Sequence, residues 1–190
     1  MKYKRVTITT IGMLSIMTLL CKTSAEPQVD TTKPPLPSTA LVIPESVQTE
    51  HAAIHAALVE ATKAPGDVGV AAKELAHILH PHFVREEQIA LPPIGLLAAL
   101  AAHTPVPDSV LAEALTMSDA LKAELPRMLE EHKHIRTAVA KLLAAARAEQ
   151  ATKAISLAEE LALHAQTEEE VFYPTTILVG EIIRARSQNK

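Results

Sequence analysis

The sequence has few aromatic residues and few glycines. Two Tyr, two Phe and no Trp make up 2% of its 190 residues, and it contains five Gly. Because β-sheets favour aromatic and β-branched side chains, a β-sandwich or a β-barrel is disfavoured. The chain also lacks the GxGxxG and GxxxxGK patterns of phosphate-binding loops, which argues against a nucleotide-binding enzyme. These absences favour one all-helical domain rich in alanine and leucine.

The N-terminal segment is typical of a signal peptide. Three basic residues among the first five precede an uncharged, mostly apolar run over residues 6–20, and small residues follow at 23–25. This run is shorter than the roughly 20 residues that a membrane-spanning helix needs, which disfavours the alternative of a membrane anchor. Lipid attachment at Cys21, a second alternative, is disfavoured because a leucine precedes this cysteine. We predict cleavage near Ala25 and a periplasmic or secreted protein without a membrane span.

Cleavage at this point would change both the charge and the chemistry of the chain. It removes four basic residues and no acidic ones, which leaves 14 basic against 22 acidic residues and a net charge of −8. Such a chain has no electrostatic footprint for nucleic acid. The only cysteine is removed too, so disulfides, thiolate metal ligands and a cysteine nucleophile are excluded. The helices must then be held together by apolar burial, by a metal, or by both.

Prolines divide the remaining chain into a linker and four long helical segments. Residues 26–44 combine prolines with polar residues, which is typical of a disordered linker. Within the helical part, Pro126 predicts a kink and Pro174 predicts the end of the last long helix. We therefore predict an all-α fold, an up-down-up-down four-helix bundle over residues 45–186. The periodicity places its helices at residues 45–64, 68–91, 108–148 and 151–173.

Each long segment carries one stripe of inward-facing residues, with the spacing of a left-handed bundle. Most stripe positions are aliphatic, but histidines interrupt all four stripes and glutamates interrupt two. An uncompensated buried carboxylate costs several kcal/mol, so a glutamate on such a seam requires a cation or another partner. The stripes are Val47, His51, Ile54, Leu58, Ala61; Leu75, Leu79, His82, Glu86, Ile89; Leu125, Leu129, His132, Ile135 or Arg136, Val139; and Leu161, His164, Glu168, Val171.

The two halves of the chain repeat each other. A Glu-His-x-x-Ile motif occurs at 50–54 and at 131–135, and a His-x-x-x-Glu-Glu motif followed by a proline occurs at 82–92 and at 164–174. The two histidines of a copy are 31 residues apart in the first copy and 32 in the second. In each copy the i, i+4 spacing of His and Glu places both on one helix face. Two hairpins packed about a pseudo-two-fold axis would bring six ligands together: His51, His82, Glu86, His132, His164 and Glu168.

Four imidazoles and two carboxylates suit a pair of first-row transition metals. Each ion would take two histidines, and the two glutamates would bridge the ions. Imidazole favours iron, zinc, copper or nickel, whereas bridging carboxylates in a bundle core favour a di-iron or di-manganese centre. We predict two non-haem iron ions in an Fe–O–Fe type of centre, with manganese or zinc as alternatives.

These motifs resemble the hemerythrin-like family, also called the HHE cation-binding family. The similarity covers about residues 45–174 and consists of Glu-His-x-x-Ile, His-x-x-x-Glu-Glu and the closing proline, each occurring twice. The resemblance implies a four-helix bundle in which the four motif histidines are terminal iron ligands. It also implies that Glu86 and Glu168 are the bridging carboxylates.

The chain departs from the oxygen-carrying members of that family in two helices. Those members resemble it, but they carry a second histidine one turn after the first in the third helix, where this chain has Arg136, and an Asp one residue later in the fourth. The departure puts their five-histidine site in doubt. His55, one turn after His51, is the candidate for an additional ligand. The set of four His and two Glu is closer to members implicated in iron handling or in the repair of nitrosative damage.

The remaining polar residues are not predicted to bind metal directly. A ferritin-like di-iron site built on Glu74-x-x-His77 and Glu131-x-x-His134 is disfavoured, because both histidines lie off the apolar seams and break the repeat. Tyr173 is assigned to packing. Surface positions are predicted for His77, His80, His103 and His134. A solvated face, or the orientation of ligand imidazoles, is predicted for Glu50, Glu87, Glu131, Glu169 and Glu170.

Several functions fit this set of residues. The first is an exported carrier, scavenger or sensor that binds dioxygen, nitric oxide or peroxide. The alternatives are a di-iron peroxidase or nitric oxide-detoxifying or repair enzyme, periplasmic iron storage or delivery, and a purely structural bundle. A redox partner protein is implied by the first two functions, and no motif indicates a pocket for a larger substrate.

Overall fold

The computed structural model describes residues 39–188, and all its regular elements in that range are helical. The long helices are α1 (Glu45–Ala61), α2 (Gly66–Ile89), α4 (Asp108–Ala148) and α5 (Thr152–Thr167). The shorter ones are η1 (Pro92–Leu96), α3 (Leu97–Ala101), the π-helical turn η2 (Glu168–Phe172) and α6 (Tyr173–Gln188). The all-α prediction is therefore confirmed for these residues. The predicted signal peptide, Cys21 and the linker up to residue 38 lie outside them.

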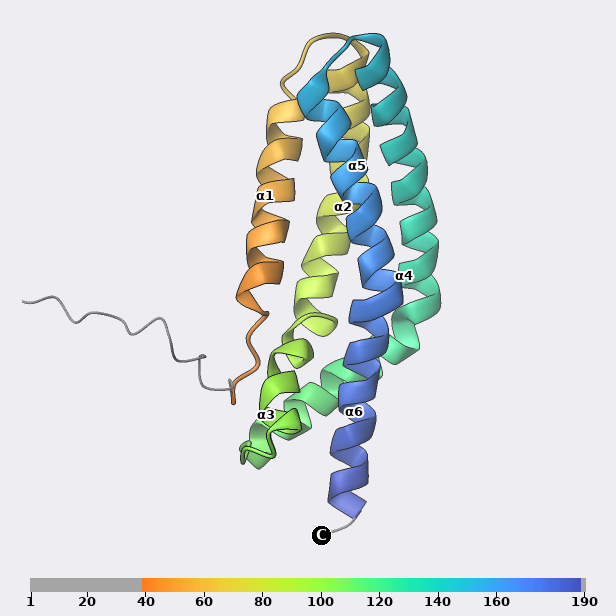
Figure 1. Ribbon diagram of the computed structural model, residues 1–190. Helices are drawn as coiled ribbons and strands as arrows, with labels where there is room; N and C mark the ends of the chain where they lie inside the picture. The colour runs from red at the N-terminus through yellow and green to blue at the C-terminus, as the bar shows by residue number, and fades with distance from the viewer. Residues whose placement is uncertain (1–38, 189–190) are drawn as a thin grey trace, which may run out of the picture. The chain divides into compact units, whose positions relative to one another are not determined.

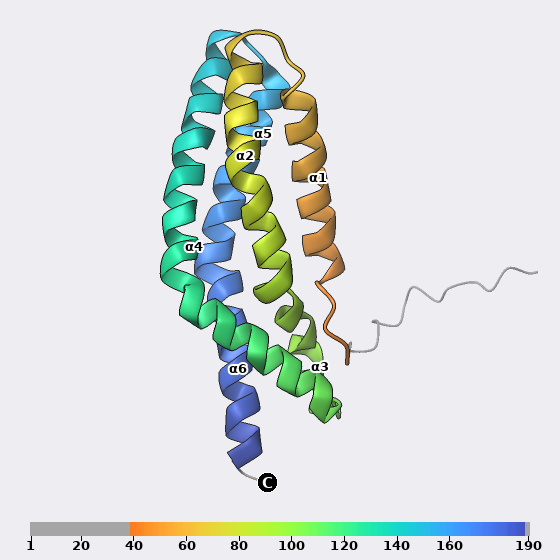
Figure 2. The same cartoon turned by 180° about the vertical axis from the view of Figure 1, so that it is seen from behind.

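The long helices lie side by side as a bundle, and their chain direction alternates (Figures 1 and 2). The α1–α2 and α4–α5 connections lie at one end of this bundle. The pieces η1 and α3, the first part of α4, and α6 form the other end. Helix α4 packs against α2, α5 and α6, while α1 packs against α5 and α2. The four helices therefore enclose one common interior.

Helix α4 bends near its middle, where Pro126 lies (Figure 2). Proline lacks an N–H and clashes with the preceding turn, so a bend without a break is its expected effect inside a helix. Before His132 the stripe differs from the predicted one, because Met128 is fully buried and Leu129 is half-buried. The observed positions keep alternating steps of four and three, which holds a seam on one face.

The interior has a polar layer between two apolar clusters. In α1, Val47 belongs to the cluster on one side of this layer and Ile54 to the cluster on the other side, with His51 between them. In α4, Met128 and Ile135 enclose His132 in the same way. Each ligand candidate is thus held within a close-packed apolar surround, which fixes its rotamer and keeps water away.

A widened helical turn follows the motif glutamate in both copies. The N–H of Leu91 donates to the carbonyl of Glu86 (3.1 Å), and the N–H of Tyr173 donates to the carbonyl of Glu168, in each case five residues back. The next residue is a proline in both copies, and it has no N–H to offer to an ordinary α-helical turn. In the second copy this turn is the π-helical η2, which continues into α6, whereas in the first copy it closes the end of α2, where the N–H of Ala90 also donates to Glu86.

Pro174 does not end the fourth helical segment, so that prediction was wrong. The π turn η2 runs directly into α6, so the helical segment continues through Pro174. Its counterpart Pro92 does follow the end of α2 and begins η1. The π turn also changes which side chains face the core. Val171, which lies within it and was predicted to face the core, is 50% exposed, while Tyr173, directly after it, is 1% exposed.

The connections at the ends of the helices are anchored. Glu149, just after α4, accepts a hydrogen bond from the N–H of Asp67 (2.7 Å) and so ties the end of α4 to the start of α2. Gly66 has a φ of 72°, a left-handed conformation that favours glycine. Of the predicted linker, the structure describes residues 39–44, in which Leu41 and Ile43 pack against the bundle.

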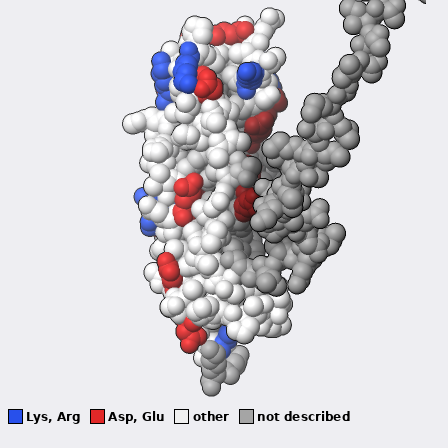
Figure 3. Space-filling model, turned by 90° about the vertical axis from the view of Figure 1, so that its left-hand side faces the viewer, with Lys and Arg blue, Asp and Glu red and all other residues white. Residues whose placement is uncertain are grey.

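The outer surface of the described part carries scattered charge. On the face shown in Figure 3, small groups of acidic and basic side chains are scattered over a largely uncharged surface. None of the helices within residues 39–188 is long and apolar enough to cross a membrane.

Candidate metal centre

The structure brings all six residues of the duplicated motif together in the polar layer. His51 comes from α1, His82 and Glu86 from α2, His132 from α4, His164 from α5, and Glu168 from the first position of η2. None of these side chains belongs to a residue more than 4% exposed. Buried imidazole and carboxylate groups require partners, and here they are one another's neighbours.

The first group consists of His82, His132, Glu86 and Glu168. The Nε2 atoms of His82 and His132 are 2.8 Å apart. Glu86 Oε1 lies 3.3 Å from His82 Nε2, and Glu168 Oε2 lies 3.4 Å from His132 Nε2. Ligand atoms of all four residues lie within 4.8 Å of one another, so this group could hold a metal ion.

The second group consists of His51, His164 and Glu168. Glu168 Oε1 lies 2.8 Å from His164 Nε2 and 3.6 Å from His51 Nε2. These three residues also offer atoms within 4.8 Å of one another. Among the described residues, Glu168 is common to both groups, with one carboxylate oxygen facing each. Glu86 lies in the first group, and its predicted role as a second bridge stays a prediction.

A glutamate faces the outer nitrogen of each imidazole. Carboxylates only accept hydrogen bonds, so the Nδ1 atoms donate and the Nε2 atoms are directed at the centre. Outer partners of this kind fix the tautomer and orientation of metal-binding histidines. The pairs are His51 with Glu87 (3.4 Å), His82 with Glu131 (2.8 Å), His132 with Glu169 (2.8 Å) and His164 with Glu50 (3.1 Å).

These outer pairs follow the sequence repeat. His51–Glu87 and His132–Glu169 each join two helices of one copy, while His82–Glu131 and His164–Glu50 join one copy to the other. The orienting role predicted as one option for these four glutamates is therefore supported by their positions. Glu170, the fifth candidate, is exposed and accepts from Gln166 instead.

The centre has the unsatisfied atoms expected of a cation site. Four buried atoms lack a hydrogen-bond partner among the described residues: His51 Nε2, His164 Nε2, Glu86 Oε2 and Glu168 Oε1. All four atoms belong to residues of the two groups. His164 Nε2 and Glu168 Oε1 lie 2.8 Å apart but do not form a hydrogen bond with each other. Buried polar atoms normally have partners, so this donor set fits a bound metal cation.

The pKa values of two imidazoles indicate that they carry protons at the place where a metal would bind. Burial lowers the pKa of His82, but the carboxylates of Glu86 and Glu131 outweigh burial and raise this pKa to about 9. Burial likewise opposes protonation of His164, and Glu168, Glu86 and Glu50 together raise its pKa to about 9. In the metal-free protein, protons on these imidazoles therefore offset the carboxylate charges.

The two glutamates have opposite pKa shifts. Burial, followed by the charge of Glu168, raises the pKa of Glu86. Burial acts on Glu168 in the same direction, but the imidazoles of His132, His164 and His51 outweigh it and hold the pKa of Glu168 well below its usual value.

Tyr173 is a site residue that the sequence reasoning missed. Its hydroxyl donates to Glu86 Oε1 and lies 3.1 Å from His132 Nε2 and 3.5 Å from His82 Nε2. Burial and the charges of Glu86 and Glu168 raise the pKa of this phenol, which keeps it protonated. A signal was present in the sequence, because a tyrosine here replaces the leucine of the first copy, Leu91, directly before the repeated proline.

The remaining candidate residues lie away from the centre. His55 is exposed and belongs to neither group; it lines a cavity between α1 and α2. Glu74 pairs with Lys141 on the surface. In the other pair of the ferritin-like alternative, Glu131 contacts the outer nitrogen of His82, while His134 is exposed. The predicted surface positions are confirmed for His77, His80, His103 and His134.

No protein-family model matches the chain, and neither a curated protein nor a solved structure matches it. The chemistry of the site therefore rests on its own geometry.

Proposed function

We propose that this protein is a hemerythrin-like, non-haem di-iron protein that binds dioxygen or another small diatomic ligand. The observation that carries the proposal is the convergence of four buried imidazole Nε2 atoms on two buried carboxylates, with an outer glutamate behind each imidazole. His82, His132 and Glu86 would hold one ion, His51 and His164 the other, and Glu168 both. Iron bound by imidazole and carboxylate supplies reversible ligand binding or redox chemistry at its open coordination positions.

The protein's own residues define the environment of that chemistry. The aliphatic clusters on both sides of the polar layer exclude water from it. The outer glutamates hold the Nδ1 protons of the imidazoles, which leaves Nε2 as the atom that binds a metal once its own proton is displaced. Complete burial of the ligands favours a resident metal over stored cargo, because release would require the bundle to open. The signal-peptide pattern of the first 25 residues adds export to the periplasm or beyond as part of the proposal.

Metal analysis and oxygen exposure test the proposal together. Protein purified without added metal is expected to contain about two iron ions per chain. Oxygen added to the anaerobic ferrous protein is expected to give a visible charge-transfer band that disappears when oxygen is removed. Irreversible oxidation would indicate an enzyme instead, and a zinc-loaded protein without response would indicate storage. Well under one metal ion per chain would overturn the proposal.

A further inference from the structure

The two ligand groups have different aromatic neighbours. Tyr173 lies against the first group, with its hydroxyl within 3.5 Å of His82 and His132 and bonded to Glu86. The equivalent residue of the first copy is Leu91, which has no polar side-chain atom to place beside the second group. The pseudo-symmetry of the motif is therefore broken at this position.

The phenol of Tyr173 covers one side of the first group. It contacts three of the four ligand residues there, and it is fully buried together with Leu121 and Met128. A ligand added to an ion in this group would have to displace the hydroxyl from a buried carboxylate. Buried hydrogen bonds to charged groups are among the strongest in proteins, so this displacement is unfavourable.

The second group faces hydrocarbon instead of a hydroxyl. The ring of Phe83 is stacked on His51, with centroids 4.4 Å apart, and meets the edge of His164 at 5.7 Å. Such a ring limits access but provides no hydrogen bond that a small ligand would have to break.

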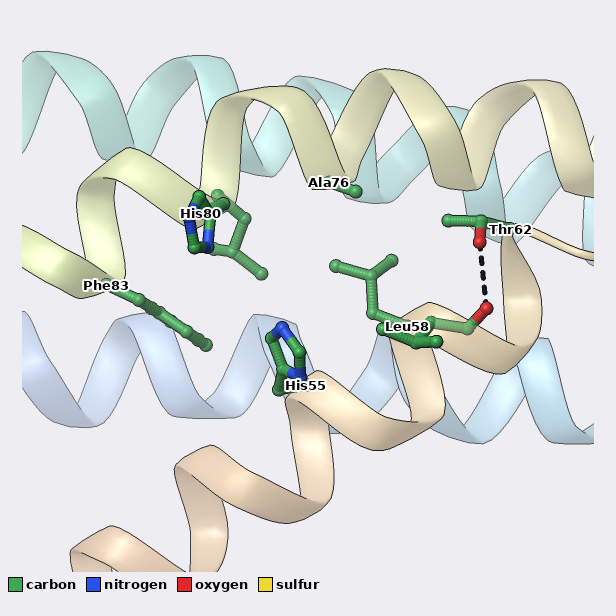
Figure 4. A pocket seen from close by; sticks show the side chains of 8 residues that line it. His55, Leu58, Thr62, Ala76, His80 and Phe83 are labelled. Carbon is green, nitrogen blue, oxygen red and sulfur yellow. Dashed lines mark hydrogen bonds between the residues drawn. The ribbon is translucent and has the colours of Figure 1, made fainter.

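A cavity lies on the other side of Phe83. It has a volume of about 200 Å³, several times that of a water molecule, and lies between α1 and α2. Leu58 and His55 approach from α1, and Ala76, His80 and Phe83 from α2, with their side chains directed toward one another (Figure 4). An adjoining groove is lined by His55, His80 and Phe83 as well, and it reaches the ligand candidate His51. The cavity and the groove thus lead from the surface to Phe83 and His51, a ligand candidate of the second group.

We propose that the exogenous ligand binds at the ion held by His51, His164 and Glu168 and enters between α1 and α2 past Phe83, while Tyr173 keeps the other ion closed. The inference rests on the proposed function, because it requires both ions to be present. It assigns the ligand position to one ion and gives Tyr173 the role of a positioning residue that holds Glu86 and excludes ligand.

Azide titration of the oxidised, iron-loaded protein tests the role of Tyr173. The wild-type chain is expected to bind one azide per two irons, counted from the azide-to-iron absorption band. Tyr173→Phe keeps the ring and removes the hydroxyl, so it is expected to retain two irons and to bind two azides. Two azides in the wild type, or one in Tyr173→Phe, would overturn the inference while leaving the di-iron proposal in place. A chain without iron would overturn both.

The entry route has its own test in the rate of azide binding. Ala76→Leu fills part of the cavity and is expected to slow association at least tenfold without changing the number of azides bound. Ala140→Leu makes the same change on the exposed face of α4 and is the matched control, with an unchanged rate. Equal rates in the wild type and Ala76→Leu would overturn the route. A crystal structure of the azide complex with azide on the ion beside Tyr173 would overturn the assignment itself.

Discussion

Glu86 and Glu168 occupy equivalent positions in the two copies of the motif, yet their surroundings differ. Glu168 lies among three imidazoles, those of His132, His164 and His51, and its pKa is held well below the usual value. Glu86 has one imidazole, His82, within 3.5 Å and receives a hydrogen bond from Tyr173, and burial raises its pKa. A repeat in sequence therefore does not produce two equal half-sites.

The difference originates in the residues around the repeat. A tyrosine follows the π turn of the second copy and a leucine stands at the same position of the first, and Phe83 on α2 has Ala165 as its counterpart on α5. One half of the centre is thus bounded by a hydroxyl and the other by a phenyl ring next to a cavity. Equivalent ligands can in this way be given unequal access to solvent and to small molecules.

The largest difference is expected when the two glutamates are removed in turn. Glu168→Gln alters both groups and should leave the chain without bound metal, whereas Glu86→Gln should retain about one ion, since the second group does not include Glu86. Metal analysis of the purified variants measures this, and Glu130→Gln, which changes an exposed glutamate of α4, should retain two ions. Loss of metal should also lower the melting temperature, because an ion at 1,000 times its Kd contributes about 4 kcal/mol. Equal metal content in the two variants would refute the inequality of Glu86 and Glu168.

A strong pH dependence of metal affinity is expected next. His82 and His164 have pKa values of about 9 without metal, so below pH 9 each ion must displace a proton from an imidazole. Affinity for each ion should rise about tenfold per pH unit between pH 7 and 9 and then level off. Competition titrations with a chelator at several pH values measure it. The slope of the logarithm of affinity against pH should be the same for the two ions, because each ligand group contains one of these histidines. Unequal slopes would show that the two groups release different numbers of protons.

The stability of the metal-free protein should depend on pH in the opposite direction. The two pKa values are raised above the ordinary value of 6.5, so their contribution is fully present below pH 6.5 and is lost as the pH rises through about 9. Thermal melts of the metal-free protein should give a lower melting temperature at pH 9.5 than at pH 6.5. His134→Ala, which changes an exposed histidine, should melt with the same pH profile as the wild type. A metal-free melting temperature that rises over this range would contradict the assignment.

Substitution of the outer glutamates is expected to have a smaller effect on metal affinity. This effect should again differ between the first and the second ligand group. Glu131 and Glu169 lie 2.8 Å from their histidines and are 32% and 27% exposed, whereas Glu50 and Glu87 lie at 3.1 and 3.4 Å and are 47% and 50% exposed. Loss of such a partner costs about 10- to 100-fold in metal affinity. Glu131→Gln and Glu169→Gln should lose metal affinity within that range. Glu50→Gln and Glu87→Gln should lose only about threefold. Similar losses at all four positions would mean that the closer contacts do not matter.

The smallest effect is expected at Arg136, which donates to Glu169 from a half-exposed position. Exposed ion pairs contribute about 0–1 kcal/mol, so Arg136→Ala should weaken metal binding by less than about fivefold. Arg136→Lys should restore part of the loss, as measured by the same chelator competition. A loss as large as that of Glu169→Gln would make Arg136 an essential partner of the first half.

Much of the centre could be predicted from spacing along the chain. His-x-x-x-Glu places two side chains on one helix face wherever the helix lies, and the matched distance to a leading histidine implies equivalent heights in the bundle. The six residues, their burial and the outer role of Glu50, Glu87, Glu131 and Glu169 followed from such local rules. The continuation of the helix beyond Pro174 did not, because it depends on a π turn that no propensity indicates.

The sequence by itself determined which helices form, which face of each is apolar and which six polar residues interrupt those faces, because these properties depend on residue type and on helical period. The tertiary structure decided which histidine meets which, that Glu168 lies between both groups, and that Tyr173 turns toward one of them. Those outcomes depend on how four helices approach one another and on one additional residue in a single turn. Such distances between helices are set by the packing of the whole interior, and no local pattern specifies them.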